Sequence, residues 1–467
     1  MKLTNLLLIT FITCFCLTTN SFATTYPDTT GAVTPHRSFM TPNAVISVDY
    51  SIDGRWLISG GASKTVDVWS VGTGKKLFSL TDGHTDDILA VKCAPNKRFI
   101  ASAGVDKTII IWDIITREKI YVLKGHKDYI TSLDFTSDSR FLASASWDKS
   151  VIIWDAITGT RLQTLIGHDD NVTSVAFNPD GTKVVTGCGD HVIRTWDVKE
   201  GNLELSFSGH TDEIWDVKWS ENGKFIASGG WDNKVRVWDV AKKEQTLTMP
   251  GHVTDVWSVA FTLDHQSLVT CGGDRRVKLW DLASGELIKD LSGTTHTSDI
   301  EEVSISPDNK FVASASRDGS IRVWELPSLS ERITILTKRE IDRWLEKGDY
   351  ESTADYKKRM KSKKKKYLEV KEEVVERLKK FYIASVNWRE GNEIIGYNAD
   401  DAYFVVKSPV FGNLKMKVPN NQAAALEKNK ERIEYRDIEL VYSNGELKVG
   451  SMTAYFKGMN RRYNVSS

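Results

Sequence analysis

A tryptophan that returns at an almost constant interval is the feature that most limits what this chain can fold into. Seven tryptophans are separated by 43, 42, 42, 42, 42 and 44 residues, and they are Trp69, Trp112, Trp154, Trp196, Trp238, Trp280 and Trp324. A fixed period of this length indicates a repeat protein, because one such unit alone cannot bury its apolar faces. The sequence therefore predicts seven copies of one supersecondary unit.

Three further residue types keep a fixed distance from the tryptophan. A serine or threonine stands 10 residues before each of the seven. In the last six units an aspartate stands 6 residues before the tryptophan and a histidine stands 28 residues before it. The six complete sets are His84, Ser102, Asp106 and Trp112; His126, Ser144, Asp148 and Trp154; His168, Thr186, Asp190 and Trp196; His210, Ser228, Asp232 and Trp238; His252, Thr270, Asp274 and Trp280; and His296, Ser314, Asp318 and Trp324.

Each unit also contains four short runs of β-forming residues. In the fourth unit these runs are residues 172–177, 183–186, 192–197 and 203–207, with a turn predicted at 178–181. Gly-His opens and Trp-Asp closes units two to six, at residues 83–84 and 112–113 in unit two. This pattern resembles the WD40 repeat over residues 35–336. The resemblance implies an all-β, seven-bladed WD40 propeller. After it the period ends, and the residue pattern predicts a small α+β domain at residues 337–467.

The resemblance implies a structural role for the recurring histidine, hydroxyl, aspartate and tryptophan. In the WD40 family these side chains form a hydrogen-bonded chain that ties the strands of a blade together. A neighbouring serine, histidine and aspartate would also suit a hydrolase triad, but six copies at blade spacing favour a rigid, satisfied network. The ring is expected to close with residues 37–40 as the outer strand of blade seven, and residues 332–336 are the alternative.

The resemblance also indicates where a partner would bind. In WD40 propellers, exposed contact positions lie three and five residues after the repeat histidine and just before the repeat aspartate, at the mouth of the channel. Here most of these positions carry aromatic or charged residues, namely Asp87, Tyr129, Trp147, Glu213, Trp215, Trp231, Asp255, Trp257, Asp299, Glu301 and Arg317. The others carry Leu89, Thr131, Asn171, Thr173, Gly189 and Gly273, and blade one offers Ala44, Ile46 and Ala62.

The predicted function is an interaction scaffold. Aromatic side chains among carboxylates, concentrated in blades five to seven, suit a protein or peptide that carries lysine or arginine. Ordinary packing between blades is the alternative explanation for Trp215, Trp231 and Trp257, because tryptophan is on average a largely buried residue. The sequence contains no recognisable catalytic, metal-binding or cofactor-binding motif, so we expect no enzyme, no metal site and no cofactor. A propeller enzyme is a remote third hypothesis.

The first 23 residues have the features of a secretory signal peptide. Lys2 supplies a positive start, residues 6–17 form an apolar run of 12 residues, and Ser21-Phe22-Ala23 offers small residues for cleavage. The run is shorter than the roughly 20 residues that a membrane-spanning helix needs, so no transmembrane anchor is expected. We predict an exported protein, periplasmic or secreted, with a short lead at residues 24–34 before the propeller.

The C-terminal domain is predicted to mix helices and strands. One helix is expected at residues 339–347, a second is expected to begin at a cap formed by Ser352 or Thr353, and a third is expected at 423–432. Strands are expected at 393–397, 403–406, 414–418, 438–442 and 447–449, with a hairpin turn at 443–446.

This domain also carries surplus positive charge. From residue 337 onward 28 Lys and Arg stand against 20 Asp and Glu, whereas residues 1–336 carry 34 and 42. The basic run covers every side of a helix, so a solvated helix face cannot account for all of it, and an exposed, partly frayed helix is the simplest explanation. Contact with an envelope polyanion, glycan or anionic lipid is the alternative function, docking on the acidic mouth is a third hypothesis, and nucleic acid is not expected for an exported chain. The run is Lys357, Lys358, Arg359, Lys361, Lys363, Lys364, Lys365 and Lys366.

Overall fold

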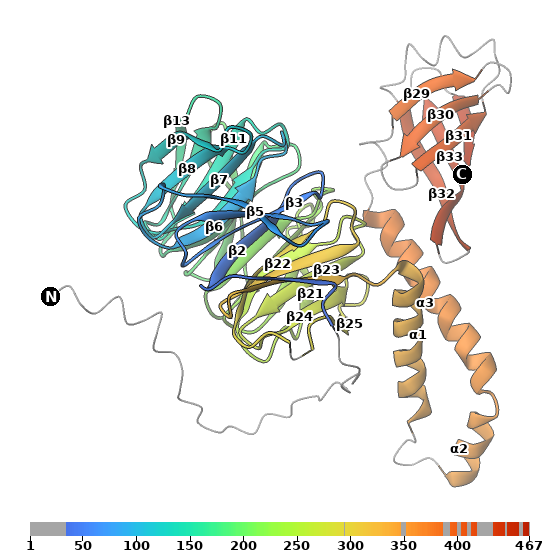
Figure 1. Cartoon of the computed structure of the whole chain (residues 1–467). Helices are drawn as coiled ribbons and strands as arrows, with labels where there is room; N and C mark the ends of the chain where they lie inside the picture. Colours follow the sequence, from blue (N-terminus) through green and yellow to red (C-terminus); the bar gives the residue numbers. More distant parts are fainter. Residues whose placement is uncertain are drawn as a thin grey trace. The chain divides into compact units, whose positions relative to one another are not determined.

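The computed structural model describes residues 34–293, 295–346 and 352–385, and six further segments at 393–398, 403–408, 412–417, 433–443, 446–456 and 461–466. The predicted signal peptide, most of the lead and the helix expected at 423–432 lie outside the described residues. Within the described part, strands β1 to β28 form seven four-stranded antiparallel sheets, the blades of a propeller (Figure 1).

The first four blades follow each other along the chain. Blade one contains β2 (Val45–Tyr50), β3 (Trp56–Gly61), β4 (Val66–Ser70) and β5 (Lys76–Leu80). Blade two contains β6 (Ile88–Cys93), β7 (Phe99–Gly104), β8 (Thr108–Asp113) and β9 (Glu118–Lys124). Blade three contains β10 (Ile130–Phe135), β11 (Phe141–Ser146), β12 (Ser150–Asp155) and β13 (Thr160–Ile166). Blade four contains β14 (Val172–Phe177), β15 (Lys183–Cys188), β16 (Val192–Asp197) and β17 (Leu203–Ser208).

The last three blades complete the ring. Blade five contains β18 (Ile214–Trp219), β19 (Phe225–Gly230), β20 (Val235–Asp239) and β21 (Glu244–Met249). Blade six contains β22 (Val256–Phe261), β23 (Ser267–Gly272), β24 (Val277–Asp281) and β25 (Leu287–Asp290). Blade seven contains β26 (Ile300–Ile305), β27 (Phe311–Ser316), β28 (Ser320–Glu325) and the N-terminal strand β1 (Arg37–Met40).

The burial of each strand follows its place in the blade. The third strand is a nearly continuous apolar run, as in β8, where five of the six residues are buried, because neighbouring blades cover both of its faces. The outer strand is mostly exposed, as in β9, where one of the seven residues is buried and three are charged. The core therefore consists of apolar layers between blades, one of which joins Leu142 and Trp154 of blade three to Ile109 and Ile111 of blade two.

Strand β1 closes the ring. It pairs antiparallel with β28, with Arg37 opposite Val323 and Phe39 opposite Ile321. Phe39 is buried and its ring lies 5.6 Å from that of Trp69 in blade one. The prediction that residues 37–40 form the closing strand is confirmed, and the alternative at 332–336 is wrong because those residues lie within a helix.

Gly319 is needed where the closing strand leaves blade seven. It has a φ of +80°, and a Cβ built on it would lie 2.7 Å from the carbonyl oxygen of Thr41. The corresponding turns of other blades carry residues such as Lys107 and Lys149 with positive φ. Only glycine avoids both the strain and the contact at this position.

The turns of each blade alternate between two rims, because neighbouring strands are antiparallel. The loops that precede the inner strands and the turns between second and third strands lie at one rim, which we call the mouth. The turns between first and second strands, and between third and outer strands, lie at the opposite rim. Strand β28 ends at the opposite rim, so the C-terminal chain leaves the propeller on the side away from the mouth.

Three helices follow the propeller: α1 (Leu329–Leu345), α2 (Thr353–Met360) and α3 (Lys363–Ser385). Ser328 and Glu331 form a capping box that starts α1. The helix predicted at 339–347 therefore begins earlier than expected, and the domain boundary drawn at residue 336 falls inside it. Ser352 caps α2, which was one of the two predicted caps.

Helices α1 and α3 pack against each other and against blade six. Ile333 and Leu336 of α1 and Val374 of α3 share one apolar cluster with Leu279 and Ile288 of blade six. Figure 1 shows α1 and α3 side by side, with α2 at the end where they connect. The apolar faces of both helices thus extend the core of the propeller.

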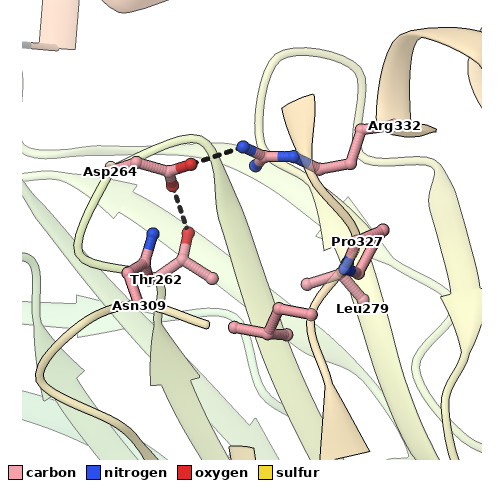
Figure 2. Close-up of a pocket in the computed structure, with 7 residues that line it drawn as sticks. Thr262, Asp264, Leu279, Asn309, Pro327 and Arg332 are labelled. Atoms are coloured by element: carbon pink, nitrogen blue, oxygen red, sulfur yellow. Dashed lines mark hydrogen bonds and ion pairs between the residues drawn. The ribbon is translucent and has the colours of Figure 1, made fainter. Parts of the chain in front are cut away.

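An ion pair fixes the start of α1 at the opposite rim. Figure 2 shows the Arg332 guanidinium beside Asp264, which follows the inner strand of blade six, at an N–O distance of 2.5 Å. The same carboxylate accepts a 2.7 Å hydrogen bond from Thr262. Arg332 is largely buried, so the pair lies at the base of the helix rather than on its solvent face.

The remaining strands form a six-stranded antiparallel sheet in the order β29-β30-β31-β34-β33-β32. Its strands are β29 (Glu393–Asn398), β30 (Tyr403–Ser408), β31 (Gly412–Lys417), β32 (Ile433–Ser443), β33 (Glu446–Phe456) and β34 (Arg461–Ser466). The five predicted strands are present, β32 and β33 pair with Ser443 opposite Glu446, and β34 was not predicted. With α1 to α3 this region has the predicted α+β composition.

Candidate functional site

The recurring side chains form hydrogen-bonded chains inside the blades. In blade three, His126 Nδ1 lies 2.9 Å from Asp148, His126 Nε2 lies 2.7 Å from Ser144 Oγ, and Trp154 Nε1 donates to the same hydroxyl at 2.9 Å. Blades two, five, six and seven repeat this arrangement. The histidines are buried, so each chain lies within a blade and supports a structural role.

Blade four departs from the predicted chain. His168 bonds Thr186 at 2.9 Å and Trp196 donates to Thr186 at 3.1 Å, but Asp190 pairs with Arg194 instead of His168. His168 Nδ1 is buried without a partner among the described residues. Burial, together with the Arg194 charge, lowers the pKa of His168 to about 4. The prediction of six equivalent chains is therefore wrong for this blade.

This difference gives a matched pair of variants. His126→Ala should lower the free energy of unfolding by about 1–3 kcal/mol more than His168→Ala. The first substitution leaves Asp148 without its imidazole partner, whereas the second removes a ring that already has an unpaired buried nitrogen. Chemical denaturation of both full-length variants measures the difference. Equal losses would mean that the aspartate bond contributes nothing to stability.

Three predicted tryptophans meet at the mouth of blades five and six. Trp215 and Trp231 stack with ring centroids 5.4 Å apart and an interplanar angle of 12°. Trp257 lies edge-on to Trp215 at 4.7 Å and to Trp231 at 6.1 Å. All three are intermediate in exposure, so they form a mutually supported cluster rather than fully buried packing between blades. We call this group the tryptophan cluster.

Two indole groups of the cluster have unpaired donors. The Nε1 atoms of Trp231 and Trp257 are buried and have no hydrogen-bond partner among the described residues, and the same holds for Trp147 in blade three. A Cβ built on Gly273 would lie 3.4 Å from Trp257 Nε1, so glycine at this position leaves space beside that donor. Buried donors are normally paired, so these indoles carry polar groups that the described residues leave unsatisfied.

Blade seven contributes a charged pair next to the cluster. The Arg317 guanidinium pairs with the Glu301 carboxylate and lies 5.9 Å from the ring centroid of Trp257. Burial raises the pKa of Glu301, although Arg317 acts in the opposite direction. The one predicted cation of the mouth is therefore already neutralised within the protein.

The carboxylates of the mouth repel one another. Burial and the charges of Asp212 and Asp299 raise the pKa of Asp255. Burial and the charges of Asp170 and Asp212 raise the pKa of Glu213. Burial disfavours the charged form of both groups and the neighbouring carboxylates add repulsion, so a cationic partner group would be favoured here.

Blade three carries a second aromatic pair. Tyr129 and Trp147 lie 5.1 Å apart, and the Lys107 ammonium lies 6.0 Å from the Tyr129 ring centroid. Asp87 is half-buried in the loop before β6, and within the described residues no hydrogen bond or ion pair joins its side chain to the other predicted residues. The structure thus groups the predicted residues of blades five to seven and separates those of blades two and three from them.

The remaining predicted positions are structural or small. Thr131 donates to the carbonyl oxygen of Val172 at 3.2 Å, and Thr173 donates to that of Ile214 at 2.6 Å, so both tie neighbouring blades together. Gly189 lies against Asp170, where a Cβ would be 3.4 Å from the carboxyl carbon. These positions shape the mouth without offering a strong contact.

Four acidic residues of the mouth were missed by the sequence analysis. Each stands two residues after a repeat histidine and accepts a hydrogen bond from the next backbone N–H: Asp86, Asp128, Asp170 and Asp212. Their constant offset from the histidine was a usable signal. They add negative charge to the loops that precede the inner strands.

A row of cations behind the mouth was missed as well. Arg194, Arg236, Lys278 and Arg322 stand two residues before the repeat tryptophans of blades four to seven. Each pairs with the aspartate of its own blade, at distances from 2.6 to 3.9 Å. Because these cations pair with the structural aspartates, they leave the carboxylates of the mouth free for a partner.

The basic run lies on α2 and the start of α3. All of its residues except Arg359 and Lys366 are exposed. Lys365 and Lys366 pair with Glu369 at 3.7 Å, and Arg359 lies over Trp344 and Tyr356. Within the described residues no ion pair joins the run to the mouth, and α1 docks at the opposite rim, which argues against the hypothesis that the run covers the mouth.

Seven closed blades with loops gathered at two rims define a β-propeller, a rigid frame that presents binding loops. The family model described as WD domain, G-beta repeat matches residues 33–70, 74–113, 117–155, 159–197, 201–239, 243–281 and 285–325. The chain belongs to the WD40 family. Each matched stretch begins with the outer strand of the preceding blade and ends with the third strand of the next. A comparison with curated proteins gives no match.

In the described residues, no helix is long and apolar enough to cross a membrane.

Proposed function

We propose that this chain is an exported scaffold that binds a protein or peptide segment with lysine or arginine side chains at the mouth of blades five to seven. WD40 propellers in general are scaffolds for protein interactions. Export rests on the features of residues 1–23, and it places the protein in the periplasm or outside the cell. The binding role rests on the geometry of the mouth.

The tryptophan cluster beside uncompensated carboxylates is the observation that carries the proposal. Stacked indoles offer a large, rigid, apolar surface that costs little conformational entropy on binding. Asp255, Glu213 and Asp299 supply the negative charge that selects a cationic side chain.

The test uses the full chain and a panel of synthetic peptides that differ only in carrying lysine, arginine or glutamate. Asp255→Asn combined with Asp299→Asn removes two charges from the mouth without changing side-chain size. The matched control, Glu118→Gln with Glu244→Gln, removes two exposed charges from outer strands. We expect cationic peptides to bind the natural chain and the control, and to bind the mouth variant at least about tenfold more weakly. Equal binding by all three chains would refute the proposal.

On acidification, binding of a cationic peptide should be lost at a higher pH than it would be if these carboxylates had ordinary pKa values. Capture of a cation requires the charged forms of Asp255 and Glu213, and the pKa of each group is raised in the free protein. The affinity is therefore complete above these raised values and is lost as the pH falls through them. Titration calorimetry from neutral to mildly acidic pH measures the effect. An affinity that stays constant over that range would exclude these two groups from the contact.

The family and the structural position of the histidine chains support a non-enzymatic role, with no catalytic residue, metal or cofactor assigned. The alternative function through the basic run is independent of the mouth.

A further inference from the structure

We infer that the end of the helical pair binds an anionic phospholipid surface, while the mouth stays free because α1 docks at the opposite rim. We call this end the basic tip and define it as residues 356–368. The inference does not depend on the proposed function of the mouth.

Helix α2 has no buried residue. Helices of this length are normally held by packing of an apolar face, whereas α2 is supported by the Ser352 cap and by Arg359 over Trp344 and Tyr356, at 4.9 and 5.3 Å. The chain therefore maintains an ordered helix that contributes nothing to the apolar core. Such an element is available to an external partner.

The charge of the tip is one-sided. Eight cations lie within residues 357–366, and the ion pairs of its lysines in the described structure lead only to Glu369, at 3.7 Å and near the surface. Exposed pairs of this kind neutralise little. Lys366 lines a groove between α1 and α3 together with Arg343 and Trp344, but the other cations of the tip do not line it. Their dense, open positive surface fits a laterally extended array of phosphates better than a peptide, which needs recesses for its side chains.

Neighbouring side chains favour a lipid surface over a soluble polyanion. Leu368 is 59% exposed and stands four residues after Lys364, so both lie on one face of α3. Met360 and Tyr367 are half-buried beside the same lysines. Lysines next to apolar and aromatic side chains are typical of helices that lie in a membrane interface. Nucleic acid would instead use free aromatic faces for stacking, and Arg359 already covers Trp344 and Tyr356.

The docking of α1 determines which side the membrane would occupy. Arg332 and Arg343 pair with Asp264 and Glu286, which belong to turns of the opposite rim. Phe381 of α3 stacks on Phe225 of blade five, also next to that rim, with ring centroids 6.2 Å apart. A lipid surface bound at the tip would therefore leave the tryptophan cluster accessible, and the chain could hold a peptide and a membrane at once.

Vesicle sedimentation with the full chain tests the inference. Vesicles of equal parts phosphatidylcholine and phosphatidylglycerol should bind the protein at low salt, and pure phosphatidylcholine vesicles should not. Each Lys→Gln substitution at 363–366 should weaken vesicle binding by about fivefold, because the attraction of one lysine to an anionic surface raises the affinity by about that factor. Glutamine keeps helix propensity, so α3 should persist. The matched control replaces the exposed Lys75, Lys124, Lys199 and Lys310 of the propeller with glutamine.

A second variant separates lipid from other polyanions. Leu368→Ser should weaken vesicle binding severalfold and leave binding of dextran sulfate unchanged, and Leu162→Ser, at an exposed leucine of blade three, should change neither. Three results would overturn the inference. The first is equal binding to neutral and anionic vesicles. The second is equal vesicle binding by the 363–366 variants and the propeller control. The third is tighter binding to dextran sulfate or an oligonucleotide than to vesicles, together with vesicle binding that Leu368→Ser does not change.

Discussion

Phe39→Ala is expected to lower the free energy of unfolding of the propeller by about 3–5 kcal/mol. The Phe39 ring is 2% exposed and packs on Trp69 and Ile321, at the seam between the first and last blades. Its removal leaves a cavity where the N-terminal strand β1 pairs with β28 of blade seven. Because each blade supports the next, the loss should appear in one cooperative transition of the whole propeller rather than in a local change.

Met40→Ala is the matched control for this prediction. Met40 lies next to Phe39 on the same strand, but its side chain is 64% exposed. We expect this variant to change the free energy of unfolding by no more than about 0.5 kcal/mol. Urea denaturation followed by tryptophan fluorescence and by circular dichroism measures both. If Phe39→Ala costs no more than Met40→Ala, then β1 does not close the ring in solution.

Trp215→Ala combined with Asp255→Ala is expected to abolish capture of a cationic partner, with an affinity loss of at least about thirtyfold. Trp215 contacts both other members of the tryptophan cluster, so its removal also releases Trp231 and Trp257. Asp255 supplies a carboxylate whose charge the free protein does not compensate. The two changes together remove the aromatic anchor and the charge that selects the partner.

The control uses the same residue types on the other side of the mouth. Trp147→Ala combined with Asp87→Ala alters blades two and three, where the structure does not group the predicted residues into one cluster. We expect this pair to lower affinity much less than the first. Thermal unfolding should show a folded propeller for both. A larger loss from the blade two and three variant would move the binding site to that side.

The sequence period was sufficient to predict seven copies of one unit, because each blade repeats the same burial problem and the same solution. The propeller, its closing strand at 37–40 and the tryptophan positions at the mouth were implied by the resemblance to the WD40 family. What the period could not provide was any departure from it. Asp190 pairs with Arg194 and not with His168, although Arg236 and Lys278 stand at the same offset in blades five and six and the histidine keeps its aspartate there.

The helical region shows a different limit. The capping box of Ser328 and Glu331 was readable in the sequence, but the β-branched residues after it favoured a strand at 332–336. The structure places these residues in α1 because Ile333 and Leu336 pack on blade six and Arg332 reaches Asp264. Tertiary contact decided between two local preferences. The mutual stacking of Trp215, Trp231 and Trp257 likewise depends on which loops the ring brings together, which spacing alone does not reveal.

The pairing of β1 with β28 also determines when this protein can become complete during its synthesis. Blades one to six are each made from a continuous stretch of chain, but residues 37–40 must wait until residues 320–325 have been made. Until then Phe39 has no partner strand, and one edge of the unfinished ring stays open to other chains. Among the described strands of the propeller, the first to be made is thus the last to pair, and a chain terminated before β28 would contain nearly all of its blades without a closed ring.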